Sequence, residues 1–366
     1  MSRKILVTGG AGYIGSHTCL ELLQAGYQVV VVDDLSNSVQ EALDRVEILT
    51  TQKITFYQVN LLDKEALERV FQQEGALEAV IHFAGKKAVG ESVAQPGMYY
   101  QNNVTGSLIL FECMQKYGVK RIVFSSSATV YGDPVQVPIK EDARIQPSNP
   151  YGHSKAMIEQ VLRDWHHAHQ WEIIILRYFN PVGAHASGII GEDPKYPNNL
   201  VPYVSQVAAG IRDHITIFGD DYPTADGTGI RDYIHVVDLA LAHVAALQSV
   251  FDHHDTTEDT KAITDHEASM NHTRWSVYNV GTGRGYSVHE VIATYRQVSG
   301  QPIAARIGPR RSGDVAVCTA DVALIATELG WRAQFDLHAM IESAWTWQSN
   351  NPQGYLKTEE SDRSGN

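Results

Sequence analysis

Residues 4–15 read KILVTGGAGYIG, and this stretch decides the predicted fold. An apolar run of strand length enters a turn with Gly9, Gly12 and Gly15, and a helical pattern over 14–25 follows. Glycines in such a turn let the backbone approach a pyrophosphate, whose negative charge the N-terminus of the following helix then faces. The stretch therefore predicts a strand–turn–helix unit that binds a dinucleotide.

An acidic residue at the end of the next apolar run, 28–33, supports this interpretation. Asp33 lies 18 residues after Gly15, where a carboxylate accepts hydrogen bonds from the hydroxyls of the adenosine ribose. Residues 34–40 contain no Lys or Arg that could hold a 2′-phosphate. The sequence therefore favours NAD over NADP as the cofactor.

Short apolar runs and longer helical patterns alternate along the first half of the chain. The runs of strand length are 4–8, 28–33, 55–58, 79–83, 121–125 and 172–177, and the helical patterns are 14–25, 64–73, 98–117 and 154–169. Repeated strand–helix units of this kind give a parallel sheet with helices on both faces. We therefore predict an α/β protein with a Rossmann-type doubly wound parallel sheet.

The composition changes in the second half of the chain. We assign 1–180 to an NAD-binding Rossmann domain, to which a helical segment near 232–250 is expected to return. Residues 181–231 are rich in Gly, Pro, Asn and Asp, so 181–366 is expected to form a smaller α/β domain that binds the substrate. The polar stretch 251–274 is interpreted as a surface insertion, and its histidines as loop residues rather than metal ligands.

The net charge and the cysteine content limit which binding partners and which cellular compartment are expected. With 29 Lys and Arg against 42 Asp and Glu, the formal net charge is −13, so nucleic acid is not an expected partner and a phosphorylated substrate needs a local basic site. Cys19, Cys113 and Cys318 match neither a disulfide framework nor a zinc site, so no metal is expected. With no signal peptide and no apolar run of about 18 residues, the sequence predicts a cytoplasmic protein without a membrane span.

Two residues four positions apart point to acid–base chemistry. Tyr151 and Lys155 would share one face of a helix, so that a phenol and an ammonium reach the same site. A free tyrosine has a pKa of about 10, and the nearby positive charge of Lys155 and of the nicotinamide ring of NAD+ lowers it, which would make Tyr151 a usable general base. Ser127 follows the strand 121–125 at the carboxyl edge of the sheet, where ligands bind, so we expect it to hydrogen-bond the substrate.

Several ordered motifs carry a resemblance to a known family. The glycine turn, HFAG at 82–85, SSSATVYG at 125–132 and the pair Tyr151 and Lys155 together resemble the extended short-chain dehydrogenase/reductase family, which includes NAD-dependent epimerases and dehydratases. Within it, the chain resembles the UDP-glucose 4-epimerases from residue 4 to about 355, outside the stretch 251–274. The segments that carry this are VGES at 89–92, RYFNPVGAH at 177–185, PNNL at 197–200, DGTGIRDYIH at 226–235 and RRSGD at 310–314.

The resemblance implies which residues form the site. Besides Gly9, Gly12 and Gly15, those expected to contact NAD are Tyr13, Ile14, Asp33, Asn37, Asn60, Leu61, Phe83, Ala84, Lys87, Asn102, Tyr151, Lys155 and Phe179. Asn60 departs from the family, which often has an aspartate there. Those expected to hold the UDP-sugar are Ser127, Asn180, Asn199, Phe218, Arg231, Arg311, Asp314 and Cys318. The two arginines would supply the basic site, because a guanidinium binds phosphate oxygens in a bidentate way.

The same resemblance implies an activity: reversible inversion of C4 between UDP-glucose and UDP-galactose, a step of galactose metabolism, through a 4-keto sugar and bound NAD. Cys318 takes the place of a tyrosine that some members have near the sugar C2, so its small side chain predicts room for an N-acetyl group, although it also fits a plain buried apolar residue. Ala128 and Thr129 replace the Asp-Glu pair of the family's dehydratases, which disfavours dehydration. The family also implies a homodimer through 98–117 and 154–169.

Two alternatives stay open at the level of sequence. The first is epimerisation or decarboxylation of a UDP-uronic acid on the same fold, which product analysis with UDP-glucuronate would reveal. The second is a non-catalytic protein that senses a dinucleotide. Such a protein need not keep Ser127, Tyr151 and Lys155 together, so their joint presence argues against it.

Overall fold

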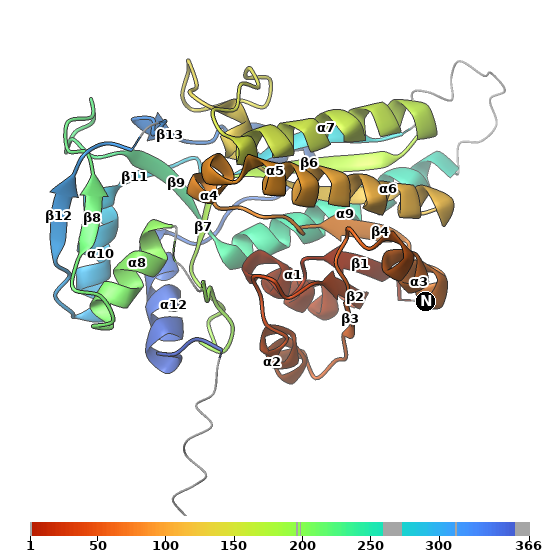
Figure 1. Ribbon diagram of the computed structural model, residues 1–366, viewed down its shortest axis with the longest axis horizontal. Coiled ribbons are helices and arrows are strands. Elements are labelled where there is room, and N and C mark those ends of the chain that lie inside the picture. The colour runs from red at the N-terminus through yellow and green to blue at the C-terminus, as the bar shows by residue number, and fades with distance from the viewer. Residues whose placement is uncertain (1, 195–196, 198, 259–272, 312, 356–366) are drawn as a thin grey trace, which may run out of the picture.

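A seven-stranded parallel sheet forms the larger part of the molecule (Figure 1). The computed structural model describes residues 2–194, 197, 199–258, 273–311 and 313–355. The strands, in the spatial order β10-β6-β5-β4-β1-β2-β3, are β1 (Lys4–Thr8), β2 (Gln28–Asp33), β3 (Thr55–Gln58), β4 (Ala79–His82), β5 (Arg121–Ser127), β6 (Glu172–Tyr178) and β10 (Trp275–Val280). Because the chain winds outward from β1 in both directions, the predicted doubly wound order is confirmed.

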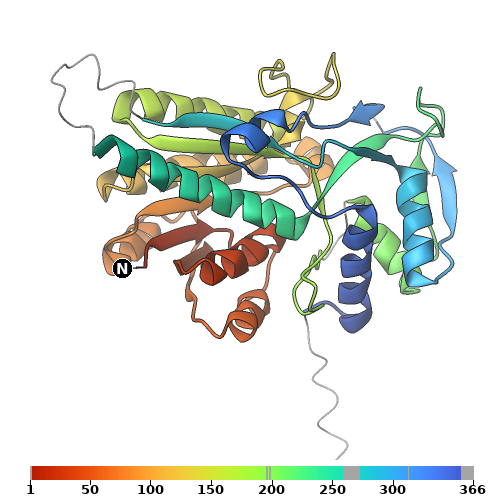
Figure 2. The ribbon, with the colours of Figure 1, turned by 180° about the vertical axis from the view of Figure 1, so that it is seen from behind.

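Helices cover both faces of this sheet (Figures 1 and 2). Successive side chains of a strand point to opposite faces, so Ile5 and Val7 of β1 enter one buried cluster and Leu6 enters the other. The first cluster includes α1 (Tyr13–Gln24), α2 (Glu41–Thr50), α9 (Val236–Glu258) and α11 (Ala323–Glu328), and the second includes α3 (Lys64–Glu74), α6 (Gly106–Lys116) and α7 (Pro150–His169).

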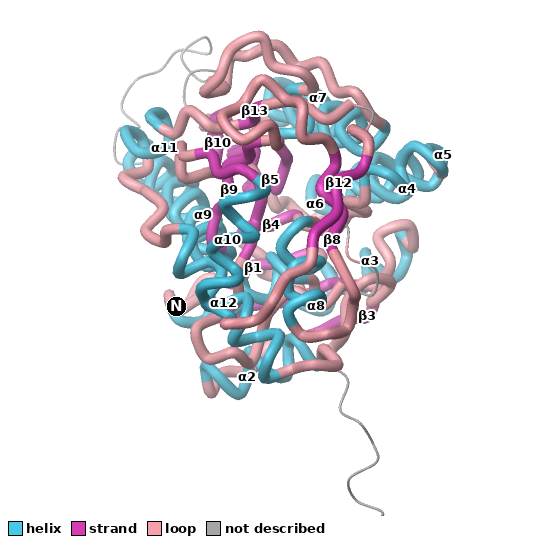
Figure 3. The backbone as a smooth tube through the Cα atoms, turned by 90° about the vertical axis from the view of Figure 1, so that its left-hand side faces the viewer, coloured by secondary structure: helices cyan, strands magenta, loops and turns pink. Residues whose placement is uncertain are grey.

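A smaller α/β part lies beyond the carboxyl edge of the sheet (Figure 1), and it faces the viewer in Figure 3. In it β9 (Ile230–His235) pairs with β7 (Asn180–Val182), β11 (Gly285–Ser287) and β13 (Val317–Cys318), and β8 (Ile215–Phe218) pairs with β12 (Ala305–Gly308). Its helices α8 (Leu200–Ala208), α10 (Val288–Ser299) and α12 (Leu337–Asn350) share a separate buried cluster. The division into domains at residue 180 stays a prediction.

The six predicted strands are all present, and three of the predicted helical segments differ from the helices in the structure. α7 begins at Pro150 rather than at 154, because the Asn149 side chain caps it by accepting a hydrogen bond from the Gly152 amide at 2.9 Å. The predicted helix 98–117 is divided into α5 (Pro96–Tyr99), a π-helical segment (Tyr100–Thr105) and α6, after the short α4 (Val89–Ala94). α9 continues to Glu258, into the predicted insertion.

The strand β10 was not predicted, and it pairs with β6 at the edge of the large sheet. Residues 259–272 of the predicted insertion lie outside the described residues, and so does His266. In the described parts of the chain, no helix is long and apolar enough to cross a membrane.

Candidate active site

The carboxyl ends of the parallel strands bring the predicted residues to one edge of the sheet. β1 ends at Thr8 and runs into the glycine turn, while β5 ends at Ser127 and β6 at Tyr178. Ser127 and Tyr178 are directly paired in the register of β5 with β6. Because all these strands are parallel, their carboxyl ends meet at the same edge, so cofactor and hydroxyl residues share one location.

The glycine turn forms a cradle that only glycine permits. Gly9 has a φ of +71°, and a Cβ atom there would lie 2.7 Å from the Ala84 amide nitrogen. A Cβ atom on Gly15 would lie 2.2 Å from the Gly9 carbonyl oxygen. Gly12 caps α1, whose first turn carries no acidic side chain. The turn and the helix N-terminus therefore fit a dinucleotide pyrophosphate.

Asp33 connects the turn to the loop that follows β2. Its carboxylate accepts hydrogen bonds from the amides of Ala11 and Leu35, both at 3.0 Å, and from the Ser38 hydroxyl at 2.8 Å. Burial raises the pKa of Asp33, and these hydrogen bonds act in the opposite direction. The carboxylate is thus fixed at the end of β2, where the sequence places the ribose.

The presence of asparagine rather than aspartate at position 60 is explained by the neighbouring Asp34. Its amide nitrogen donates to the Asp34 carboxylate at 2.8 Å. An aspartate at position 60 would face Asp34 with a second negative charge, so asparagine suits this chain.

The other predicted cofactor contacts are spread around the turn. The Tyr13 hydroxyl donates to the Gly183 carbonyl at 2.6 Å, and the Lys87 ammonium lies 5.9 Å from the centre of the Tyr13 ring. Asn102 donates to its neighbour Asn103 at 3.0 Å. Three of the remaining residues are buried: Ile14, Leu61 and Phe179. Phe83 packs on the His243 ring, and Ala84 lines the turn. Asn37 is exposed on the loop after β2.

Tyr151 and Lys155 are both buried, with 5% and 4% of their surface exposed. The Lys155 ammonium donates to the Ser125 carbonyl at 2.7 Å, and burial lowers the pKa of Lys155 to about 8. Burial raises the pKa of Tyr151 well above its usual value, and neighbouring Tyr178 raises it too, whereas Ser127 and Lys87 lower it. Burial is the largest of these effects in the chain without cofactor. The expected lowering depends on Lys155 together with the nicotinamide ring of bound NAD+, so it stays a prediction.

Ser127 is oriented by a residue that the sequence did not single out. The Thr129 hydroxyl donates to the Ser127 hydroxyl oxygen at 3.0 Å, and the Thr129 amide approaches the same oxygen at 3.3 Å. The Ser127 oxygen is thus held from the Thr129 side, and the Ser127 hydroxyl also hydrogen-bonds the Tyr151 phenol, which lowers the pKa of Tyr151.

A basic cluster lies in the smaller part of the molecule. The Asp314 carboxylate lies 2.9 Å from Nε of Arg311 and 3.8 Å from a terminal nitrogen of Arg231. The Arg311 guanidinium lies 4.7 Å from the centre of the Phe218 ring. Cys318 is paired with Arg231 in the register of β13 with β9. These five predicted residues are thus brought together.

Glu192 links the two sides of the site. Its carboxylate lies 3.1 Å from the Lys87 ammonium and 3.5 Å from the Asn199 amide nitrogen. Asn180 begins β7 and is paired with Tyr233 of β9, the strand that also carries Arg231. Predicted cofactor residues and predicted substrate residues are therefore connected through one carboxylate.

Comparisons with known proteins agree with this geometry. The model of the NAD dependent epimerase/dehydratase family matches residues 5–257. The chain belongs to this family. A UDP-glucose 4-epimerase of Bacillus subtilis (strain 168) is 56% identical over 357 residues, which cover 97% of this chain and 99% of that protein.

Two solved structures extend the comparison. The UDP-glucose 4-epimerase of Bifidobacterium longum in complex with NAD+ and UDP has a TM-score of 0.87 and 50% identity, and the match covers 96% of this chain and 99% of that one. The UDP-Glc/GlcNAc 4-epimerase of Campylobacter jejuni has a TM-score of 0.79 and 36% identity, with 95% and 100% of the chains covered.

This member of the epimerase/dehydratase family also has a buried network that the sequence did not reveal. Glu159 and Arg177 form an ion pair behind Lys155, with 2.6 Å between the nearest oxygen and nitrogen. A signal was available, because Tyr151, Lys155 and Glu159 are spaced four residues apart and so follow one helix face. Tyr178 carried no comparable signal beyond its place after a strand.

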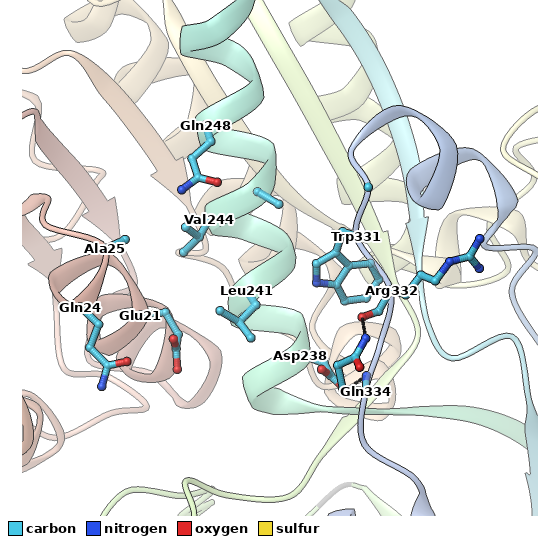
Figure 4. Close-up of a pocket in the computed structure, with 12 residues that line it drawn as sticks. Glu21, Gln24, Ala25, Asp238, Leu241, Val244, Gln248, Trp331, Arg332 and Gln334 are labelled. Carbon is cyan, nitrogen blue, oxygen red and sulfur yellow. Dashed lines mark hydrogen bonds between the residues drawn. The ribbon is translucent and has the colours of Figure 1, made fainter.

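A groove of about 450 Å³ lies elsewhere, between α1, α9 and residues 330–334 (Figure 4). Asp238 accepts hydrogen bonds there from the amides of Gln334 and Phe335, both at 3.0 Å. None of the predicted site residues lines this groove. No group of three metal-ligating side chains occurs among the residues that the structure describes.

Proposed function

We propose that this protein inverts C4 of a UDP-hexose, interconverting UDP-glucose and UDP-galactose through a 4-keto sugar with NAD bound. The observation that carries the proposal is the position of Tyr151 and Lys155. Both are buried, Tyr151 hydrogen-bonds Ser127, and Lys155 donates to the Ser125 carbonyl two residues earlier on β5. The UDP-glucose 4-epimerases to which the chain is similar supply the substrate class.

The glycine turn and Asp33 would hold NAD, which would supply hydride transfer from and back to the sugar C4. Tyr151 takes the proton of the sugar O4 and later gives it back. The Ser127 hydroxyl, oriented by Thr129, donates to the same sugar oxygen and so stabilises the charge that develops there. The Lys155 ammonium stabilises the phenolate form of Tyr151.

Inversion requires the keto sugar to present its other face while the nucleotide stays bound. Arg231 and Arg311 can retain the diphosphate, because Asp314 positions both guanidinium groups without enclosing them. Rotation about the diphosphate link then exposes the opposite face of C4. The cofactor is restored in each cycle, so it stays bound between turnovers.

We propose that the N-acetyl sugars UDP-N-acetylglucosamine and UDP-N-acetylgalactosamine are also substrates. Cys318 is half-buried beside Arg231, and burial raises the pKa of its thiol to about 11, so it is a small neutral wall at pH 7. A similar protein of known structure is named for activity on both UDP-Glc and UDP-GlcNAc.

One assay tests these proposals. Purified protein without added NAD is offered UDP-galactose, UDP-N-acetylgalactosamine and UDP-glucuronate separately, and products are separated by chromatography. We expect UDP-glucose and UDP-N-acetylglucosamine from the first two and no product from the third. If UDP-glucuronate alone were converted, the substrate would be a UDP-uronic acid and not a UDP-hexose. No conversion of any sugar by protein that retains NAD would point to a dinucleotide sensor.

We further propose a cytoplasmic homodimer. α6 and α7 lie side by side on one face of the sheet, and Met157 of α7 has 46% of its surface exposed (Figure 1). An exposed apolar side chain on a helix pair suits contact with a second copy. The three cysteines are free thiols, which suits a reducing compartment. Light scattering would measure the mass in solution, and cell fractionation would test the location.

A further inference from the structure

A buried ion pair lies on the far side of Lys155 from Tyr151. The side chains of Glu159 and Arg177 have 8% and 5% of their surface exposed. Nε of Arg177 lies 3.1 and 3.2 Å from the two carboxylate oxygens, and its Nη2 lies 2.6 Å from Oε2. The Ser126 hydroxyl donates to Oε1 at 2.5 Å. The carboxylate of Glu159 is therefore fixed at both oxygens.

This carboxylate is aligned with the predicted catalytic pair. Tyr151, Lys155 and Glu159 occupy successive four-residue steps of α7, so their side chains follow one face of the helix. That face packs on β5, where Lys155 binds the carbonyl of Ser125 and Glu159 binds the hydroxyl of Ser126. Two adjacent residues of one strand thus hold the ammonium and the carboxylate next to each other.

Arg177 is held in turn from the other side. Its Nη1 donates to the Tyr131 hydroxyl at 3.0 Å and to the Glu141 carbonyl at 2.9 Å. A buried ion pair contributes little net stability, because removing both charges from water costs about as much as their attraction returns. The Glu159–Arg177 pair is hydrogen-bonded on both sides and lies next to the Lys155 ammonium. A role in the site therefore explains it better than a contribution to stability.

On the basis of the epimerase function above, we propose that Glu159 is a positioning residue that keeps Lys155 protonated, so that its ammonium can stabilise the phenolate of Tyr151. Tyr151 is then the deprotonated partner and accepts the proton of the sugar. Glu159 acts through Lys155 and does not touch the substrate.

The charges around Lys155 support this assignment. Burial lowers the pKa of Lys155, and Glu159 is the group that raises it. His82 of β4 also faces Lys155, but burial lowers its pKa to about 3, so it stays neutral. Further titratable groups lie near Tyr151, Lys155 and Glu159 on the elements packed on α7. They are Arg177 and Tyr178 of β6, Tyr131 of the short 3₁₀ turn after β5 with Glu141 beside it, Tyr99 of α5 with Glu91 of α4, and Lys87 before α4.

The test is a pH profile of kcat with UDP-galactose for Glu159→Gln. Loss of the negative charge lowers the pKa of Lys155, so the alkaline limb, where Lys155 loses its proton, moves to lower pH by about one unit. We expect kcat at pH 8.5 to fall by about fivefold to tenfold, with KM changed less than about twofold, because the substrate contacts remain.

Glu172→Gln is the matched control. It breaks the pair of Arg121 with Glu172, at 2.9 Å, which joins the same strands β5 and β6 at their opposite ends. This variant should lower Tm and leave the pH profile of kcat unchanged. If Glu159→Gln does not fold, the double variant Glu159→Gln with Arg177→Met removes both buried charges and should fold, with a smaller shift of the alkaline limb in the same direction, because the Arg177 cation is removed too.

The outcomes separate the two proposals. An active wild type whose Glu159 variants keep the alkaline limb of the wild type overturns the role of Glu159 and leaves the epimerase function intact. A wild type that converts no UDP-sugar overturns the epimerase function, and the role of Glu159 with it.

Discussion

Tyr178 lies opposite Ser127 across the β5–β6 pair, and its phenol neighbours that of Tyr151. Paired residues of parallel strands point to the same face of the sheet, so Tyr178 joins Ser127 and Tyr151 in one group of hydroxyls. This group combines a strand-end serine, a strand-end tyrosine and a tyrosine from the first turn of α7.

Tyr178→Phe should shift the acid limb of the pH profile. Tyr178 raises the pKa of Tyr151, so its removal lowers that pKa and lets Tyr151 lose its proton at lower pH. We expect the acid limb of kcat to move down by about half a unit to one unit. Tyr295→Phe, which removes a buried phenol bonded to Ser205 in the smaller part, is the control. An acid limb at unchanged or higher pH would contradict the prediction.

Tyr151→Phe should remove most activity and spare the cofactor. The loss of one acid–base group typically lowers kcat by about 10²–10⁴-fold. The glycine turn and Asp33 are unaffected, so the purified variant should still carry NAD, measured by absorbance after denaturation. Normal turnover in this variant would refute the role of Tyr151 as the base.

Gly15→Ala should disrupt the turn. The new Cβ atom would lie 2.2 Å from the Gly9 carbonyl oxygen, and this backbone atom cannot move without opening the turn. We expect a loss of about 1–3 kcal/mol in the free energy of unfolding and protein that is purified without NAD. Gly90→Ala is the control, because no atom lies within 4 Å of its Cβ position. Equal Tm values for the two variants would contradict this prediction.

The glycine turn and the strand pattern were sufficient to predict the large sheet, because a parallel strand buried on both faces is a continuous apolar run. The strand Trp275–Val280 was missed since it alternates polar and apolar residues after a polar stretch. The helical pattern over 98–117 gave no indication of the π-helical segment Tyr100–Thr105.

The residues of the candidate site could be predicted where a short, local spacing in the sequence indicates their function. Tyr151 and Lys155 are about one helical turn apart, so their spacing alone was enough to predict that they share one face of the helix. The pairing of Ser127 with Tyr178 depends on strand register, and the contact of Glu159 with Arg177 depends on how α7 packs on the sheet. Neither is a property of a short sequence window.

The width of the sugar pocket is tested by Cys318→Tyr. A tyrosine at this position would place a ring beside Arg231, where the small neutral thiol now lies. Steric exclusion rejects the larger ligand without weakening the smaller one. We therefore expect the variant to lose about 10²-fold or more of kcat/KM for UDP-N-acetylgalactosamine and to retain activity on UDP-galactose within about threefold. Cys318→Ala, which keeps the wall small, should retain both activities. Because a thiol with a pKa of about 11 is uncharged at neutral pH, a difference between the two variants would come from volume and not from charge. A wild type inactive on the N-acetyl sugar would show that another residue closes the pocket.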